Sequence, residues 1–176
     1  TFYECKSLTT PPDMSNAISV TDMSYTFFYC FSLTTAPDLS NATSVTNMSY
    51  TFCGCSSMST ISVIPSGVTN MRSTFYLCEV LRAVPALPNG VTDMESTFFG
   101  CSWLQTVPAI PSSVTNMKST FDACRSLYGE IEINANPTSY SSCFGSTNNP
   151  ITIVGSCSDE TKANLASTAY FGNVSY

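Results

Sequence analysis

A Thr-Phe pair recurs six times along the chain, and this repetition restricts the possible folds more than any other feature of the sequence. Successive pairs are 25, 25, 23, 23 and 23 residues apart. Repeats of about 20 to 30 residues stack into a solenoid, because one unit cannot bury its apolar face alone and neighbouring units must share a core. The first residues of the six pairs are Thr1, Thr26, Thr51, Thr74, Thr97 and Thr120.

Each unit repeats further apolar residues in phase with the Thr-Phe pair. Around a Thr-Phe pair, the apolar residues follow one another at spacings of three, four and three residues. Such residues lie on one face of an amphipathic helix of about three turns. We therefore predict that each unit contains a short helix whose apolar face lies in the core, with a threonine such as Thr69 as its N-cap. At one unit boundary the apolar residues are Val68, Met71, Phe75 and Cys78.

The rest of each unit is predicted to be a short extended leg. It follows the position of the repeat that holds Leu or Met. In most units a proline stands four residues after this Leu or Met, as at Pro85 and Pro108. Because proline lacks a backbone donor, strands of only two to four residues are expected there. Residues 129–133 and 150–154 have the pattern of better strands.

The repeat ends near residue 157, which predicts two domains: a solenoid of about seven turns over residues 1–157 and a C-terminal cap over residues 158–176. Residues 158–166 have the pattern of an N-capped helix, with Asp159 and Glu160 in its first turn. No comparable cap precedes Thr1, and a solenoid needs one at each end. We therefore expect the array to continue on the N-terminal side.

Composition excludes several functions. The chain has no His, a net charge of −6 and only six scattered cations, which argues against His-based catalysis, His-containing metal sites and nucleic-acid binding. No apolar stretch is long enough to cross a membrane. The carboxylate pairs at positions 93 and 95 and at 130 and 132 are interpreted as solvated surface. The sequence predicts no enzyme, no metal and no cofactor.

Residues 23–33 read Met-Ser-Tyr-Thr-Phe-Phe-Tyr-Cys-Phe-Ser-Leu, and residues 39–48 read Leu-Ser-Asn-Ala-Thr-Ser-Val-Thr-Asn-Met. These segments resemble the BspA-like leucine-rich repeats, and the likeness covers roughly residues 1–157. With the repeat pattern, it leads to an α/β fold: a right-handed leucine-rich-repeat-like solenoid with short strands, short helices and a C-terminal capping helix. The resemblance implies an extracellular or cell-surface protein that binds host proteins, matrix or other cells, without catalytic residues.

We predict an adhesion module that recognises a protein or glycan partner on a host or neighbouring cell, with no insertion into a membrane. A structural or host-recognition component of a virion or surface filament is the alternative, and further repeats of the same chain or self-assembly are additional partners. Binding is expected at outward positions that vary between units. These candidates are Trp103, Tyr76, Phe99, Phe28, Tyr3, Glu79 and Arg125. Packing between turns is the alternative role for the aromatic residues.

Nine cysteines are interpreted mainly as buried thiols. Equivalent residues in stacked turns lie about 4.8 Å apart with parallel Cβ directions, which is unfavourable for a disulfide. One or two disulfides among Cys53, Cys143 and Cys157 remain an alternative. The regular threonine columns also raise an ice-binding interpretation, which a helical setting of these threonines disfavours.

Overall fold

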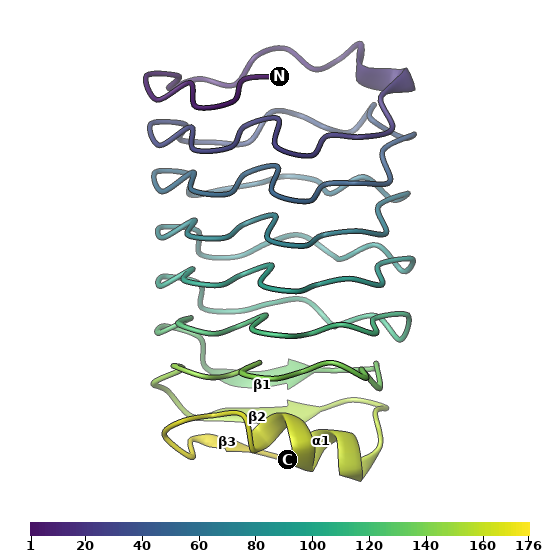
Figure 1. Cartoon of the computed structure of the whole chain (residues 1–176), viewed down its shortest axis with the longest axis vertical. Coiled ribbons are helices and arrows are strands. Elements are labelled where there is room, and N and C mark those ends of the chain that lie inside the picture. Colours follow the sequence, from purple (N-terminus) through teal and green to yellow (C-terminus); the bar gives the residue numbers. More distant parts are fainter.

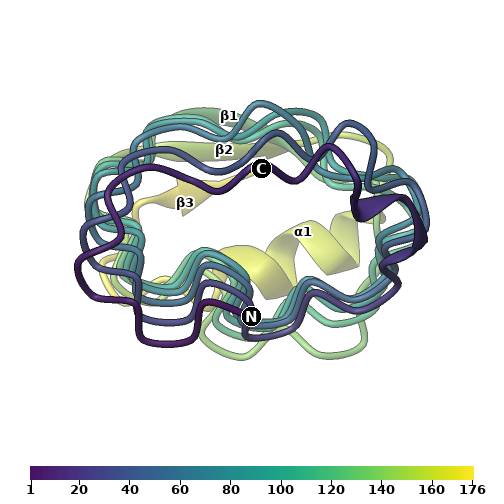
Figure 2. The ribbon, with the colours of Figure 1, turned by 90° about the horizontal axis from the view of Figure 1, so that it is seen from above.

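The computed structural model describes residues 1–176. The chain winds through turns that stack in one direction, with the N-terminus at one end of the stack and the C-terminus at the other (Figure 1). Seen along the stack, each turn is a flattened ring with two long sides (Figure 2). We call the long side that runs from the repeated Met to the repeated Leu the Thr-Phe side, for example residues 71–81. The opposite long side, for example residues 82–90, is the strand side.

Regular secondary structure is concentrated near the C-terminus. Three parallel strands form one sheet in the order β1-β2-β3, and β1 and β2 are the two better strands that the sequence predicts. Earlier turns make only isolated parallel bridges on the strand side, such as that between Thr35 and Thr60. The elements are the 3-10 helix η1 (Ala17–Ser19), β1 (Gly129–Glu132), β2 (Ile151–Val154), α1 (Asp159–Ala166) and β3 (Val174–Ser175).

A column of phenylalanines runs through the middle of the stack. Neighbouring rings are nearly parallel, with centroids between 5.3 and 5.9 Å apart. The repeated methionines, the repeated cysteines from Cys30 onward and the repeated Leu or Met from Leu33 onward flank this column and are buried. The core is therefore continuous from turn to turn, which is the arrangement that the repeat predicts. The stacked residues are Phe2, Phe27, Phe52, Phe75, Phe98, Phe121 and Phe144.

The predicted helix in each unit is wrong, although its apolar face is buried as expected. Two residues per unit, such as Ser73 (φ 51°) and Leu77 (φ 56°), have left-handed backbone conformations. A right-handed helix cannot continue through such residues, so the segment becomes a series of tight turns. The turns still bring residues spaced three and four apart to the same side. Val68, Met71, Phe75 and Cys78 are all fully buried.

Backbone hydrogen bonds on the Thr-Phe side explain why the turns replace a helix. Alternate N–H groups, those of Ser73, Phe75 and Leu77, donate to carbonyls of the next turn at 2.8, 2.9 and 2.8 Å. The N–H groups between them, such as that of Thr74, donate to the carbonyl three residues earlier. Neighbouring turns thus satisfy donors that a helix would satisfy within itself.

The threonines that the sequence analysis assigned to N-caps have another role. Thr69 is exposed, and its N–H and Oγ1 donate to the Thr46 carbonyl of the preceding turn at 2.9 and 3.3 Å. The buried Thr74 hydroxyl lies between two turns, at 2.9 Å from the Met48 carbonyl and 2.8 Å from the Met71 carbonyl. Both threonine columns therefore join neighbouring turns.

Helix α1 lies at the C-terminal end of the stack, inside the outline of the rings (Figure 2). The Ser158 side chain accepts a hydrogen bond from the Thr161 N–H at 3.1 Å, which is the N-cap interaction expected from the sequence. Leu165 is the buried residue of the helix and belongs to the core of the stack. The helix is therefore attached to the last turns through an apolar contact.

Candidate functional site

Four of the seven predicted binding residues gather on the outer surface of the Thr-Phe side. Glu79, Phe99 and Arg125 come from three successive turns and line one hollow of about 300 Å³. Tyr76 stacks on Phe99, with ring centroids 4.8 Å apart and planes 6° from parallel. We call this place the corner hollow, and its lining is Leu77, Glu79, Phe99, Gly100, Ser102, Ala123 and Arg125.

Small residues make the corner hollow possible. Gly100 has a φ of 71°, and a Cβ built on it would lie 2.5 Å from the Leu77 side chain. Glycine adopts this backbone conformation without strain, and its missing Cβ leaves room for the Leu77 side chain. Ser102 and Ala123 leave further space between the carboxylate of Glu79 and the guanidinium of Arg125. The hollow therefore offers an aromatic surface, an acid and a base within a shallow depression.

Trp103 directly follows Ser102 in the sequence but does not line the corner hollow. Its side chain is 49% exposed, and the Arg82 guanidinium carbon lies 4.8 Å from the ring centroid. This is the distance of a cation–π contact, and the pair lies at the surface. Sequence reasoning named Trp103 but missed Arg82, because the two residues are neighbours only after the turns stack.

Tyr3 and Phe28 belong to a separate group at the N-terminal end. Their rings stack with centroids 5.0 Å apart, and Phe28 also contacts Tyr25 and Tyr29. The two interpretations of the aromatic column are therefore both partly correct, since the rings pack between turns and remain partly exposed. This aromatic edge consists of Tyr3, Tyr25, Phe28, Tyr29, Phe31 and Tyr50.

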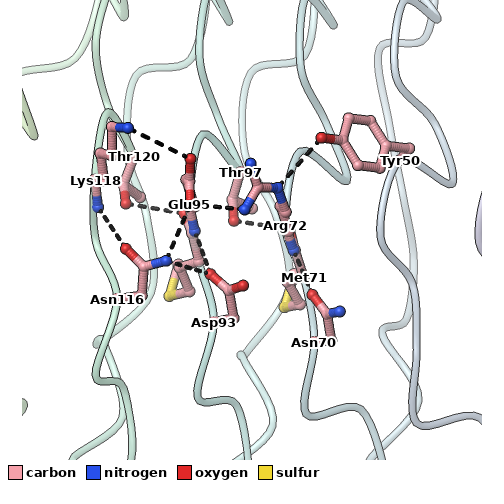
Figure 3. A network of polar contacts seen from close by, with 11 residues as sticks. Tyr50, Asn70, Met71, Arg72, Asp93, Glu95, Thr97, Asn116, Lys118 and Thr120 are labelled. Carbon is pink, nitrogen blue, oxygen red and sulfur yellow. Dashed lines mark hydrogen bonds and ion pairs between the residues drawn. The ribbon is translucent and has the colours of Figure 1, made fainter. Parts of the chain in front are cut away.

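A polar network crosses four turns beside the buried methionines (Figure 3). Arg72 donates to the Tyr50 hydroxyl at 3.2 Å and to Glu95 at 2.8 Å. Asn116 donates to the same Glu95 carboxylate at 3.2 Å, and the Lys118 ammonium is 3.9 Å from it. Glu95 was interpreted as a solvated carboxylate, but its side chain is only 16% exposed and is paired on both sides.

The network is explained by its place in the stack. The column that holds Arg72, Glu95 and Lys118 alternates in charge from one turn to the next, so each side chain meets an opposite charge. The hydrogen bond that Arg72 donates to the Tyr50 hydroxyl and the nearby Glu95 charge raise the pKa of Arg72. These contacts join turns and leave Glu95 no free oxygen directed at a substrate, so we assign the network to the scaffold.

The repeated buried cysteines act as hydrogen-bond donors, and not as nucleophiles or metal ligands. The Cys78 thiol donates to the Phe52 carbonyl of the preceding turn at 3.2 Å, and the Cys101 thiol repeats this contact with Phe75 at 3.0 Å. Burial raises the pKa of the Cys53 thiol to about 12 and raises that of Cys78 well above its ordinary value. A thiolate is the reactive form of cysteine, and burial suppresses it.

The arrangement of acidic and sulfur side chains gives no metal centre: no three His, Cys, Asp or Glu residues lie close enough together to hold an ion. All nine cysteines are free thiols in the structure, including Cys53, Cys143 and Cys157. None of the helices has the length and apolar composition needed to span a bilayer.

The family model of the BspA type leucine rich repeat region matches residues 48–167 in six copies. A second model, that of a Mycoplasma protein of unknown function, DUF285, matches residues 1–85. The first match covers more than half of the chain. The protein therefore belongs to the BspA-type leucine-rich repeat family, as the resemblance of residues 23–33 and 39–48 indicated.

A solved structure supports the same fold. The crystal structure of the leucine-rich repeat protein of T. pallidum is similar to this chain with a TM-score of 0.58 and 19% sequence identity, over 86% of this chain and 79% of that one. At this identity the likeness concerns the fold alone. No curated protein matches the sequence.

Proposed function

We propose that the protein is a recognition module that binds a protein or glycan partner through the corner hollow and performs no catalysis. The observation that carries this proposal is the gathering of Tyr76, Glu79, Phe99 and Arg125 in three successive turns. These positions vary between units: the column of Tyr76 and Phe99 also holds Cys and Asp, and the column of Glu79 and Arg125 also holds Lys, Phe and Ser. Aromatic rings beside a carboxylate and a guanidinium are common at binding surfaces, where a few such residues supply most of the affinity.

The division of labour within the repeat supports this proposal. The repeated Met, Phe and Cys side chains pack in the core. The hydroxyls of the repeated Thr and the thiols of the repeated Cys donate hydrogen bonds between turns. The outward side chains of Glu79 and Arg125 make no hydrogen bond or ion pair with a neighbouring turn, so these positions are free to vary without loss of the stack. A leucine-rich repeat fold usually serves binding in this way, with recognition residues displayed on a repeated scaffold.

The family suggests where such a module acts. We propose an extracellular or cell-surface location and a partner on a host or neighbouring cell. The alternative, a structural or host-recognition component of a virion or surface filament, places the same binding surface on a different particle. Further repeats of the same chain or self-assembly are additional proposed contacts at the ends of the stack.

We also propose that residues 1–157 belong to one solenoid domain and that α1 acts as its C-terminal cap. Support comes from Leu165, which is buried against the last turns. A cap is needed because the final turn would otherwise expose its apolar cross-section to water. Truncation before residue 158 should then cause aggregation, measured by light scattering.

Binding is tested on an array of glycans and an array of purified extracellular-matrix proteins, with labelled full-length protein. Phe99→Ala and Glu79→Ala should each weaken any specific binding by more than tenfold, while thermal unfolding stays unchanged. Tyr170→Ala is the matched aromatic control, because this residue is 67% exposed and lies in the C-terminal tail. The proposal is wrong if no array member depends on Phe99 or Glu79, or if Tyr170→Ala has the same effect.

A further inference from the structure

We propose that the strand side has a second binding site, at the seam between the third and fourth turns, and that it takes an extended peptide segment with an acidic side chain. The seam lies between residues 56–67 and residues 79–90. It shares only Glu79 with the corner hollow, and this residue stands at the edge of the seam. The inference goes beyond the proposed function, because nothing in the corner hollow requires it.

The seam is the one place on the strand side where neighbouring turns are not hydrogen bonded. No backbone or side-chain hydrogen bond joins residues 56–67 to residues 79–90. On one flank, the Ser59 N–H donates to the Thr34 carbonyl at 3.0 Å, and on the other the Gln105 N–H donates to the Arg82 carbonyl at 3.0 Å. The equivalent bond from the Arg82 N–H to the third turn is absent.

Main-chain donors and acceptors are consequently free on both sides of the seam. The N–H groups of Ile61 and Arg82 donate to no protein group, and the carbonyls of Ser59 and Ala83 accept from none. Backbone polar groups that have no partner are a ready template for another extended chain. Peptide recognition by strand addition uses such groups for affinity and side-chain pockets for selectivity.

A hollow occupies the same place. Its volume is about 460 Å³. Apolar side chains form much of the wall, with Ile61 buried and Val84 half-buried. The space therefore suits an apolar side chain of a peptide whose backbone runs along the seam. The lining is Ser59, Thr60, Ile61, Arg82, Ala83, Val84 and Pro85.

Arg82 gives the site its charge preference. It lines the hollow and places its guanidinium over the Trp103 ring, but it has no carboxylate partner in the protein. A cation held by an aromatic ring at the rim of an apolar hollow favours an acidic group on the ligand. An extended peptide presents alternating main-chain donors and acceptors to the free groups of the seam, so the observations favour a peptide over a glycan.

The probe is a phage-displayed library of random heptapeptides, selected on the full chain and, in parallel, on Ala83→Phe. Ala83 is exposed, so the larger side chain fills the hollow without entering the core. Selection should enrich peptides that contain Asp or Glu beside β-branched residues on the wild-type protein only. The same enrichment on both proteins, or none on the wild type, would overturn the proposal.

One enriched peptide is then synthesised and its binding followed by the fluorescence of Trp103, the single Trp of the chain. Arg82→Gln and methylation of the peptide nitrogens should each lower the affinity at least tenfold. Arg125→Gln, in the corner hollow, is the matched control and should leave the affinity unchanged. Equal binding to Arg82→Gln contradicts the proposal, whereas loss with Arg125→Gln alone assigns the peptide to the corner hollow.

Discussion

The two long sides of each turn come from the same repeat but are held together in different ways. On the Thr-Phe side, backbone bonds, threonine hydroxyls, cysteine thiols and stacked rings join neighbouring turns along the repeats. On the strand side, contacts range from the three-stranded sheet near the C-terminus to the seam without any hydrogen bond. The difference teaches that hydrogen bonds join the turns continuously on the Thr-Phe side, whereas on the strand side they are interrupted at one boundary.

The largest expected effect comes from breaking the phenylalanine column. Phe75→Ala removes a ring that stacks on Phe52 and Phe98 and is fully buried. We expect a loss of about 3–5 kcal/mol in unfolding free energy, because the cavity lies between two turns that cannot close onto it. Urea denaturation measures this loss.

Val84→Ala is the corresponding change on the strand side. Val84 is only half-buried and lines the open seam, so its truncation should cost less than about 1 kcal/mol. Equal losses for the two variants would contradict the idea that the Thr-Phe side carries the stability of the stack.

Raising the pH should weaken the Thr-Phe side through its thiols. Burial raises the pKa of Cys53 from 9.0 to about 12, so folding favours the protonated thiol. This stabilisation is complete below pH 9 and is lost as the pH rises toward 12. Between pH 8 and pH 10.5 the thiol of Cys53 alone should account for about 2 kcal/mol of lost stability.

Thermal unfolding of the wild type and Cys53→Ala at the two pH values isolates this contribution. The variant should lose less stability on going to pH 10.5, because tyrosines and the other thiols titrate in both proteins. An identical pH dependence for the two proteins would show that Cys53 is not buried in its protonated form.

Removing a hydroxyl that joins turns should have a smaller effect. Thr74→Val keeps the shape of the side chain but removes the donor to the Met48 and Met71 carbonyls. We expect a loss of about 1–2 kcal/mol by urea denaturation, since buried carbonyls lose a partner. Thr69→Val, in the exposed column, should change stability by less than about 0.5 kcal/mol. If the exposed change costs as much, the buried hydroxyls have no special role.

The smallest expected effect is a gain. Ala123 has a left-handed conformation with a φ of 60°, which costs a non-glycine residue about 1 kcal/mol or more. Ala123→Gly should stabilise the protein by about 0.5 kcal/mol after the entropy cost of glycine in the unfolded chain. Ala109→Gly on the strand side, where φ is not positive, should destabilise it in the same calorimetric measurement.

The repeat spacing was enough to predict the stacked turns and the buried Met, Phe and Cys columns. Local sequence patterns predicted the two better strands and helix α1. These features depend on residues that recur in phase or on local signals, such as Ser158 before Asp159 and Glu160. The candidate residues of the corner hollow were also named from sequence, because Tyr76, Glu79 and Phe99 occupy outward positions that vary between units. That they gather with Arg125 in one hollow could not be predicted, since it depends on how far each turn is offset from the next.

The amino-acid sequence by itself determined which residues face the core, because an apolar column repeated every 23 or 25 residues has one way to be buried. It did not determine the backbone path between them. Spacings of three and four residues bring Val68, Met71, Phe75 and Cys78 inward both in a helix and in a series of tight turns. Only the neighbouring turn decides between the two, by accepting the hydrogen bonds of Ser73, Phe75 and Leu77, and the same neighbours decide where the strand side stays open.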